Sequence, residues 1–448
     1  MKILILNGSP KGKYSITLQT LKYLELKFPE HTFEVIHVGQ QINKLMKDMS
    51  SVIESINDAD FIIFSYPVYT FIAPYQMHKF IELLKQQDID LSNKFATQIS
   101  TSKHFYDMTA HQYIEDNIYD LKMKYIKGLS ADMDDLTSQK GQREAIDFFN
   151  YVIWSIENNI YEVCQKTYTS PIHNPATIPT PISKRDGDVV IITDCDKEDT
   201  HLQNMIARFQ AVLPIKSRIV NILDYPFMGG CLGCFNCAVS GKCIYKDNFD
   251  EYLRNDIQKA DAIVYAFSIK DHSMGSRFKL YDDRQFCNGH RTVTIGMPVG
   301  YIVSGNLSEE NNLKTIIEAR AQVGSNNLCS IATDEGDTDA SIDKLVKTLN
   351  YALLNKYVPP QNFYGIGGMK VFRDLIWLMQ GMMRADHKFY KAHKQYDFPQ
   401  KKWPQMLAMY LVGELIAHDK LKAKIGNKMN EGMIMPYKKV LENAKKEK

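Results

Sequence analysis

The sequence predicts an α/β protein with two similar domains, each built on a doubly wound, five-stranded parallel sheet, followed by a helical C-terminal region. Three observations support this: a stretch of sequence that occurs twice, short apolar runs that alternate with helical ones, and a proline-rich segment midway along the chain. In the first half, strands are expected near residues 2–7, 32–38, 60–66, 95–101 and 124–129. Such alternation indicates right-handed crossovers with helices on both faces of a parallel sheet.

The repeat is clearest at the third strand of each domain. Residues 56–64 read INDADFIIF, and residues 257–265, 201 positions later, read IQKADAIVY. The first strands, at 2–6 and 188–192, are only 186 positions apart, so the second domain carries about fifteen extra residues between its first and third strands. Five strands per domain suit the flavodoxin-like strand order 2-1-3-4-5. We therefore expect a tandem fusion of two flavodoxin-like domains.

The segment that joins the two domains is stiff and extended. Residues 169–183 contain four prolines, which cannot continue a helix or a central strand. The expected boundaries are 1–166 for the first domain, 167–186 for the linker, 187–357 for the second domain and 358–448 for the helical extension. The extension carries an apolar helix face that contains Trp377, Met379, Met382 and Met383. We expect it to pack on the second domain or over the domain interface; a cover for a bound ligand and a membrane-surface helix are alternatives.

Composition excludes several classes of protein. A formal net charge of +2 over 448 residues gives no sign of a nucleic-acid-binding groove. No apolar run reaches the roughly 18 residues that a transmembrane helix needs. The N-terminus, MKILILNGSPKGK, runs from a short apolar stretch into a glycine turn, which indicates a buried first strand rather than a signal peptide. These features, with half of the eight cysteines in one short stretch, predict a cytoplasmic protein.

The turn after the first strand has the features of a phosphate-binding loop. Residues 7–17, NGSPKGKYSIT, lead from this strand into a helix and contain no carboxylate. Backbone N–H groups, a helix N-terminus and small hydroxyls that meet at one point bind phosphate. The candidate ligands are Ser9, Lys11, Ser15 and Thr17. An ordinary polar turn with Ser15 as the helix N-cap is the alternative.

Two further loops are expected at the same edge of the sheet. In the order 2-1-3-4-5, the first and third strands flank the crevice that opens at their carboxyl ends. The segments that follow the third and fourth strands are predicted to face a planar ligand there, and they comprise Pro67, Val68, Tyr69, Thr70, Phe71, Ser100, Thr101 and Ser102. Simple packing roles for Tyr69 and Phe71 are the alternative.

The Gly-Ser-Pro-Lys turn at residues 8–11 and the Pro-Val-Tyr sequence at residues 67–69 resemble the NAD(P)H-dependent FMN reductases and the iron-sulfur flavoproteins. The usual family loop reads Gly-Ser-Pro-Arg followed by Ser-Asn-Thr; here Lys11 replaces the arginine and Ile16 replaces the asparagine. The resemblance implies FMN in the first domain, with Ser9, Lys11, Ser15 and Thr17 on the phosphate, and residues 67–71 and 100–102 along the flavin ring.

The extra residues of the second domain contain the cysteine spacing C-x2-C-x2-C-x5-C, formed by Cys231, Cys234, Cys237 and Cys243. Four thiolates so close together suit a [4Fe–4S] cluster, and the spacing is similar to that of the iron-sulfur flavoproteins. A cluster-free thiol loop and a zinc site are the alternatives.

The second domain lacks the flavin loop. Its first turn, residues 193–200, has no glycine and contains four carboxylates, which would repel a phosphate. We therefore expect one FMN per chain, in the first domain. We hypothesise that a cluster in the second domain exchanges electrons with this FMN, so that the fused chain acts as a pseudo-dimer.

Together these features predict a flavin-dependent oxidoreductase. Its electrons would come from NAD(P)H or a small carrier such as a ferredoxin and pass to an unknown acceptor, and the chain could form homo-oligomers. A non-catalytic electron carrier or binding protein that retains the fold is the alternative.

Overall fold

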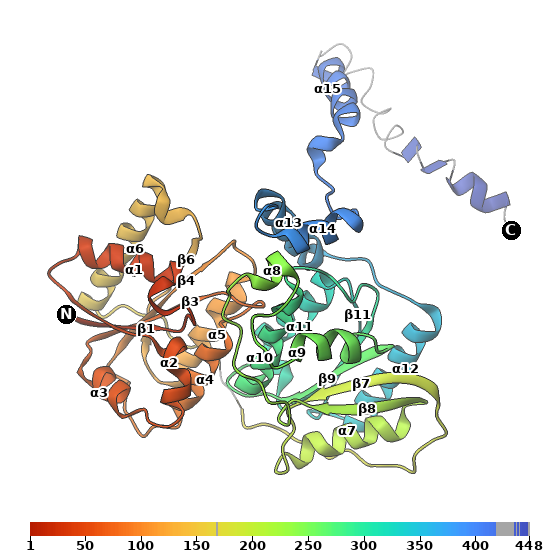
Figure 1. The fold of residues 1–448 in the computed structure, drawn as a ribbon, viewed down its shortest axis with the longest axis horizontal. Coiled ribbons are helices and arrows are strands. Elements are labelled where there is room, and N and C mark those ends of the chain that lie inside the picture. Colours follow the sequence, from red (N-terminus) through yellow and green to blue (C-terminus); the bar gives the residue numbers. More distant parts are fainter. Residues whose placement is uncertain (167–168, 418–433, 436, 439, 447–448) are drawn as a thin grey trace. The chain divides into compact units, whose positions relative to one another are not determined.

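The computed structural model describes residues 1–166, 169–417, 434–435, 437–438 and 440–446. Two parallel sheets, each covered by helices, lie next to each other in the part that contains residues 1–389 (Figure 1). The fold class predicted from the sequence is therefore confirmed. The two sheets fix where the loops at their carboxyl edges meet.

The first sheet has the strand order β2-β1-β3-β4-β5, with β6 also paired to β4. All of its pairings are parallel. Its strands are β1 (Lys2–Asn7), β2 (Thr32–Ile36), β3 (Phe61–Pro67), β4 (Phe95–Ser102), β5 (Lys124–Tyr125) and β6 (Leu129–Asp132). Its helices are α1 (Ile16–Lys27), α2 (Val38–Leu45), α3 (Ser50–Asp58), α4 (Tyr75–Lys85), α5 (Asp107–Asp120) and α6 (Gln139–Glu157), with short 3-10 turns at η1 (Gly12–Tyr14) and η2 (Asp135–Thr137).

The fifth strand, expected as one piece over residues 124–129, is divided. Ala96 pairs with Tyr125 and Ile99 pairs with Leu129, so one extra residue bulges out between these two pairs. At the break, the Thr97 hydroxyl donates to the carbonyl of Ile126 (2.8 Å), which takes an acceptor out of the regular ladder. The sheet therefore has six strands rather than five.

The second sheet repeats this topology. Its order, β11-β10-β9-β7-β8, is the same 2-1-3-4-5 arrangement when its strands are counted from β7. Its strands are β7 (Arg185–Thr193), β8 (Ile215–Asn221), β9 (Ala262–Ser268), β10 (Pro298–Ser304) and β11 (Asn327–Thr333). Its helices are α7 (Thr200–Val212), α8 (Asn236–Ser240), α9 (Phe249–Tyr252), α10 (Gly275–Arg284), α11 (Asn311–Val323) and α12 (Thr338–Asn355), with single turns at η3 (Leu253–Ile257), η4 (Gln285–Asn288) and η5 (Leu307–Glu309).

Burial of the strands on both faces explains their apolar composition. In β1, Ile3 and Ile5 belong to a cluster with α1 and α6, whereas Leu4 and Leu6 face the other side of the sheet. The latter cluster continues without a break into the second domain, where it includes Ile192. Burying apolar surface contributes about 25 cal/mol per Å², so this shared core holds the two domains together.

The domain interface is built from equivalent helices, α4 and α10. The Asp283 carboxylate of α10 accepts a hydrogen bond from the Tyr75 N–H at the start of α4 (2.7 Å). In the reverse direction, the Glu82 carboxylate of α4 accepts from the Ser276 N–H at the start of α10 (2.6 Å). Each helix therefore caps the other, because a carboxylate is stabilised at a helix N-terminus.

The remaining helices follow the second domain. They are α13 (Phe363–Leu378), α14 (Arg384–Ala392) and α15 (Trp403–Ala417), with η6 (Pro399–Lys401) before the last. This confirms a helical C-terminal region. Residues 1–389 form one compact unit, and residues 390–448 form another. Within the described ranges, none of the helices combines the length and the apolar character needed to cross a bilayer.

Candidate functional site

The turn after β1 brings a helix N-terminus and small hydroxyls to one point. Gly12 has a φ of +54°, which favours glycine, and lets the chain turn back into α1. Ser15 caps this helix, and its side chain accepts from the Leu18 N–H (3.5 Å). The first N–H groups of an α-helix lack partners within the helix, so the start of α1 is suited to an anion.

This turn borders a cavity that both domains line. Ten of the twelve side chains predicted from the sequence to bind FMN lie on its wall: Ser9, Lys11, Ser15, Thr17, Pro67, Val68, Tyr69, Thr70, Thr101 and Ser102. All four cysteines of the C-x2-C-x2-C-x5-C segment line the same cavity. The tertiary structure therefore brings together two motifs that are more than 200 residues apart in the sequence.

Two predicted residues, Ser100 and Phe71, do not line the cavity. Ser100 is buried, and its hydroxyl lies 2.8 Å from Nε2 of His111. Phe71 is buried against Phe105 and Tyr106, at ring-centroid distances of 5.0 and 4.7 Å. Phe105, which the sequence analysis did not select, takes its place on the wall. Alternation along β4 does not indicate the difference for Ser100, because Ser100 and Ser102 share one face of the strand and Ser102 lines the cavity.

The hydroxyls of Thr17 and Thr101 bond to each other across the start of the helix. Their oxygens lie 2.6 Å apart, and that of Thr17 also donates to the Tyr66 carbonyl (3.3 Å). These bonds hold the start of α1 against the ends of β3 and β4. The hydroxyls of Ser9 and Ser15 each accept from a backbone N–H (3.3 and 3.5 Å), which leaves the hydroxyl hydrogen of each available for donation to a ligand.

The cysteine segment lies directly against the first domain. A Cβ atom placed on Gly233, whose φ is +59°, would fall 2.0 Å from the Tyr69 hydroxyl oxygen. The Lys11 ammonium lies 5.6 Å from the centre of the Phe235 ring. Burial lowers the pKa of Lys11, and the negative charge of ionised Cys231 and Cys234 would raise it. Lys11 is therefore shared between the phosphate loop and the cysteine segment.

The cysteine side chains suit an iron-sulfur cluster. All are free thiols, and they line one cavity. The Gly233 N–H donates to the Cys231 sulfur (3.4 Å), and the Arg284 guanidinium lies 3.9 Å from the Cys243 sulfur, as expected around cluster ligands. Burial raises the pKa of Cys237 to about 11. A fifth thiol that the sequence analysis did not select, Cys287, also lines the cavity.

A buried ion pair from the second domain holds the loop at residues 69–71. Lys279 is fully buried, and its ammonium donates to the Tyr69 carbonyl (2.8 Å) and to the Asp283 carboxylate (2.5 Å). Asp283 in turn accepts from the Thr70 hydroxyl (2.5 Å). Burial raises the pKa of Asp283, whereas the charge of Lys279 lowers it. Nothing in the sequence near Lys279 indicates this role, because it depends on contact between the domains.

The equivalent loop of the second domain binds its own backbone instead of an anion. The Asp199 carboxylate caps α7 by accepting from the Leu202 N–H (3.2 Å), and Asp196 accepts from the Glu198 N–H (2.8 Å). Burial raises the pKa of Asp194 to about 6. The N–H groups and the space that a phosphate would need are therefore taken by carboxylates.

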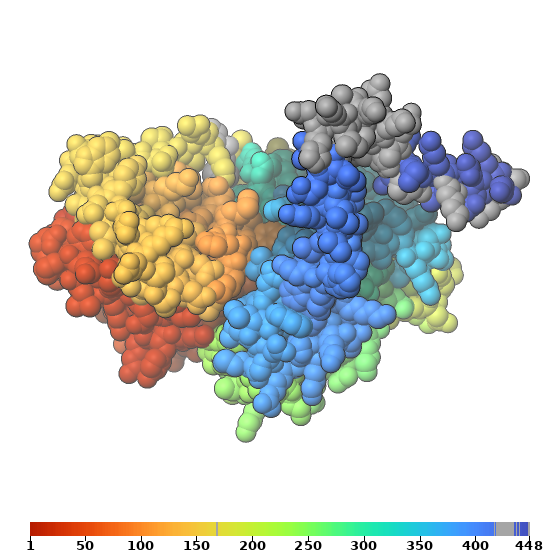
Figure 2. All heavy atoms as spheres, turned by 90° about the horizontal axis from the view of Figure 1, so that it is seen from above, coloured from red at the N-terminus to blue at the C-terminus, as the bar shows by residue number. Residues whose placement is uncertain are grey.

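Helix α13 covers one side of the cavity. Val371, Phe372 and Leu375 line it, and the Phe372 ring stacks on Phe105 at 4.3 Å with an interplanar angle of 25°. Gly368 approaches both Phe105 and Val323, so α13 contacts both domains. In Figure 2 the lighter blue surface, which belongs to the residues shortly after the second domain, adjoins the orange surface of the first domain. This part of the extension therefore packs over the domain interface, as expected, and its side chains line the cavity.

Comparison with known proteins gives a match within the first domain. The family model of NADPH-dependent FMN reductase matches residues 1–134. The matched residues include the phosphate loop and the β3 and β4 loops that line the cavity.

Individual relatives share only short or distant similarity with the chain. An iron-sulfur flavoprotein of Clostridioides difficile strain 630 is 35% identical over 54 residues, which is 12% of this chain and 24% of that protein. The chain thus matches about a quarter of that relative's length. Among solved structures, an FMN-dependent NADH-azoreductase of Bacillus anthracis in complex with FMN has a TM-score of 0.28 at 14% identity, covering 34% of this chain and 98% of its own. An NAD(P)H:quinone oxidoreductase of Methanothermobacter marburgensis has a TM-score of 0.27 at 13% identity, covering 37% and 98%.

Proposed function

We propose that this protein is a flavin-dependent oxidoreductase that binds one FMN in the cavity between its domains and a [4Fe–4S] cluster at Cys231, Cys234, Cys237 and Cys243. The observation that carries the proposal is the shared cavity, which the phosphate loop and the four cysteines both line. The match of residues 1–134 to the model of NADPH-dependent FMN reductase supports FMN as the ligand.

The side chains of the cavity have distinct roles in this proposal. Ser9, Ser15 and the start of α1 bind the phosphate of FMN, and Lys11 supplies positive charge between this phosphate and the cysteines. Tyr69 and Phe105 pack along the flavin ring, while α13 excludes water from one side. When bound, FMN supplies hydride and electron transfer, and the cluster supplies one-electron transfer.

Each domain has one of the two sites, as expected if both domains arose by duplication of an ancestral domain. The first keeps the phosphate loop and lacks the cysteines, and the second keeps the cysteines and has carboxylates at its own loop. The chain then resembles a dimer of identical subunits in which each copy has lost one of two sites. NAD(P)H or a small ferredoxin-like carrier is the proposed donor, and a small molecule is the acceptor.

Anaerobic purification of the full chain followed by a visible spectrum tests the proposal. We expect about one FMN per chain, with iron and sulfide in a ratio typical of one [4Fe–4S] cluster. Cys237→Ser is expected to lose the iron and retain FMN, whereas the control Cys164→Ser, outside the cavity, keeps both. Protein that neither retains nor takes up FMN would overturn the proposed activity.

Titration of the anaerobic protein with NADH, NADPH and reduced ferredoxin then identifies the donor. Bleaching of the flavin absorbance by one of them at a rate that supports turnover is the expected result. Bound FMN that none of the three donors reduces would instead favour a non-catalytic binding protein.

A further inference from the structure

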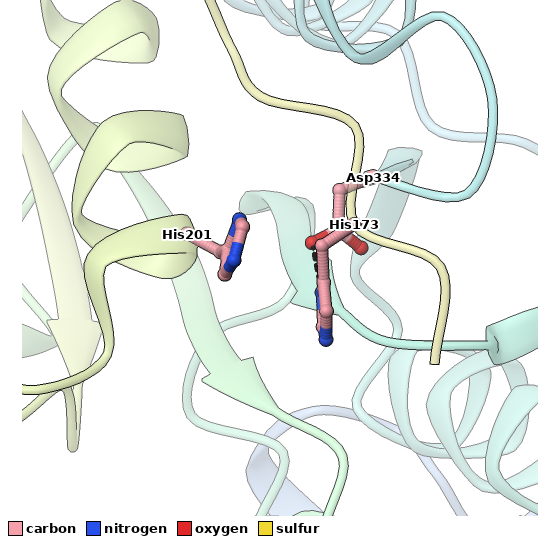
Figure 3. A group of neighbouring side chains, drawn as sticks. All are labelled: His173, His201 and Asp334. Atoms are coloured by element: carbon pink, nitrogen blue, oxygen red, sulfur yellow. Dashed lines mark hydrogen bonds and ion pairs between the residues drawn. The ribbon is translucent and has the colours of Figure 1, made fainter. Parts of the chain in front are cut away.

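A second group of polar side chains lies at the carboxyl edge of the second sheet, away from the shared cavity. It consists of His173 from the segment between the domains, His201 from the first turn of α7, and Asp334, which follows β11. Each offers one nitrogen or oxygen atom, and these three atoms all lie within 4.8 Å of one another. Figure 3 shows the two imidazole rings face to face, with the carboxylate beside His173.

The carboxylate of this group is held in place by the fold. Asp334 is fully buried, and its Oδ1 accepts from the Gly305 N–H (2.8 Å). Its Oδ2 accepts from the Ser304 hydroxyl (2.6 Å) and lies 2.8 Å from Nδ1 of His173. Such fixed outer contacts are typical of carboxylates that serve as metal ligands.

The two histidines are close enough to act together. Their rings stack at a centroid distance of 4.5 Å with an interplanar angle of 19°. Imidazole lone pairs lie in the ring plane, so the exposed His201 has to turn out of this stack for its nitrogen to reach an ion held by His173 and Asp334. Because His173 is half-buried and His201 is exposed, such an ion can exchange with solvent and keep a water ligand. Two imidazoles and one carboxylate are donors that divalent first-row transition ions prefer.

The charge around the group favours a cation. The loop before His201 contains Asp194, Asp196, Glu198 and Asp199, against one lysine, Lys197. The negative charge that makes this edge unsuitable for a phosphate therefore attracts a positive ion.

We propose that His173, His201 and Asp334 bind a divalent transition-metal ion of the Zn²⁺ type, which fastens the segment between the domains to the second domain. In a tetrahedral site with bonds of about 2.1 Å, neighbouring donor atoms lie about 3.4 Å apart. The ion takes the place of the proton that His173 and Asp334 share, and this proton leaves to solvent. The His173–Asp334 separation then opens by about 0.6 Å, which a rotation of the half-buried His173 can supply.

A second group, formed by Asp116, His272 and Glu310 at the domain interface, has donor atoms at similar separations. There Nε2 of His272 lies 2.9 Å from the Asp120 carboxylate and Nδ1 lies 2.8 Å from the Glu310 carboxylate, while Asp116 accepts from the Lys166 ammonium (2.9 Å). These contacts form a buried network of ion pairs, in which both ring nitrogens of the histidine face carboxylates.

Titration of the full chain with Co²⁺, followed by competition with Zn²⁺, tests the site. We expect His173→Ala and His201→Ala each to lose one equivalent of bound ion, with at least a 100-fold weaker affinity at that site. The control His31→Ala, in the first domain, is expected to bind as the wild type does. The Co²⁺ spectrum of the wild type minus that of His201→Ala reports the ion bound at this site. It should lack the intense thiolate-to-cobalt bands that Co²⁺ bound to the cysteines would give.

Limited proteolysis supplies a readout that does not depend on spectroscopy. Zn²⁺ should slow cleavage within residues 169–183 in the wild type and not in His201→Ala, while FMN binding is the same in both. Equal binding in wild type and both histidine variants, thiolate bands in the difference spectrum, or cleavage that Zn²⁺ does not slow would each overturn the proposal. Because neither readout involves flavin, failure here leaves the proposed oxidoreductase function untouched.

Discussion

Replacing Lys279 with methionine should damage both the stability of the protein and its affinity for FMN. Lys279 and Asp283 are fully buried, and their charged groups are 2.5 Å apart. Removing one partner of a buried ion pair leaves an uncompensated charge and costs about 3–5 kcal/mol. We expect the free energy of unfolding of Lys279→Met, measured with urea, to fall by that amount.

The effect on FMN follows from the loop that this pair holds. Thr70 and Phe71 have φ values of +43° and +72°, a left-handed conformation that costs non-glycine residues about 1–3 kcal/mol each. Without Lys279, the loop can relax away from this conformation and must be ordered again when FMN binds. If binding has to restore about 1.4–2.8 kcal/mol, affinity falls about 10- to 100-fold.

Fluorescence titration of FMN separates this effect from general destabilisation. The double variant Lys279→Met/Asp283→Leu removes both charges, so it should recover part of the stability but not the FMN affinity. Lys140→Met, whose side chain is 84% exposed, is the control and should change neither quantity measurably. Wild-type FMN affinity in folded Lys279→Met would refute the reasoning.

Two further predictions concern charged side chains. Burial opposes the charge of His272, but hydrogen bonds to Asp120 and Glu310 raise its pKa to about 9. The contribution of His272 to the free energy of unfolding is therefore fully present below about pH 6.5 and is lost as the pH rises through about 9. The urea midpoint of the wild type should therefore fall between pH 7 and 10 more steeply than that of His272→Gln, and parallel curves would contradict this. Lys11→Met should weaken FMN binding about tenfold, measured by fluorescence, because Lys11 lines the cavity. Lys13 is exposed and lies outside the cavity, so the control Lys13→Met should bind FMN within about threefold of the wild-type affinity. Equal losses in both lysine variants would show that only overall charge matters.

The local parts of the site could be predicted from the sequence because they depend on neighbouring residues. The loop from Ser9 to Thr17 lies between a buried strand and a helix, and the strand order places Tyr69 at the same edge. The fifth strand differs from the expectation because a bulge divides it, and Ser100 lies beside His111 of α5 rather than on the cavity wall. Both features depend on strand register and on how α5 packs on the sheet, which a single sequence specifies weakly.

The contacts between the domains could not be predicted in this way. Lys279 and Asp283 are ordinary helix residues in the sequence, and they reach the Tyr69–Thr70 loop only because α10 packs against α4. Phe372 lines the cavity only because α13 returns to the first domain. Each contact joins residues more than 200 positions apart, so no local sequence pattern predicts it.

The sequence by itself determined two parallel α/β domains, the phosphate loop of the first and the cysteine spacing of the second. These features follow from hydrophobic periodicity, turn chemistry and residue spacing, which act over a few residues at a time. Only the tertiary structure decided that the loop and the cysteines line one cavity, and that His173 meets Asp334. The shared cavity depends on burial of the apolar core between the domains, which brings together segments that are far apart in the sequence. The contact of His173 depends on the path of the linker over the second domain, where the Asn174 N–H donates to the Asp334 carbonyl (2.8 Å).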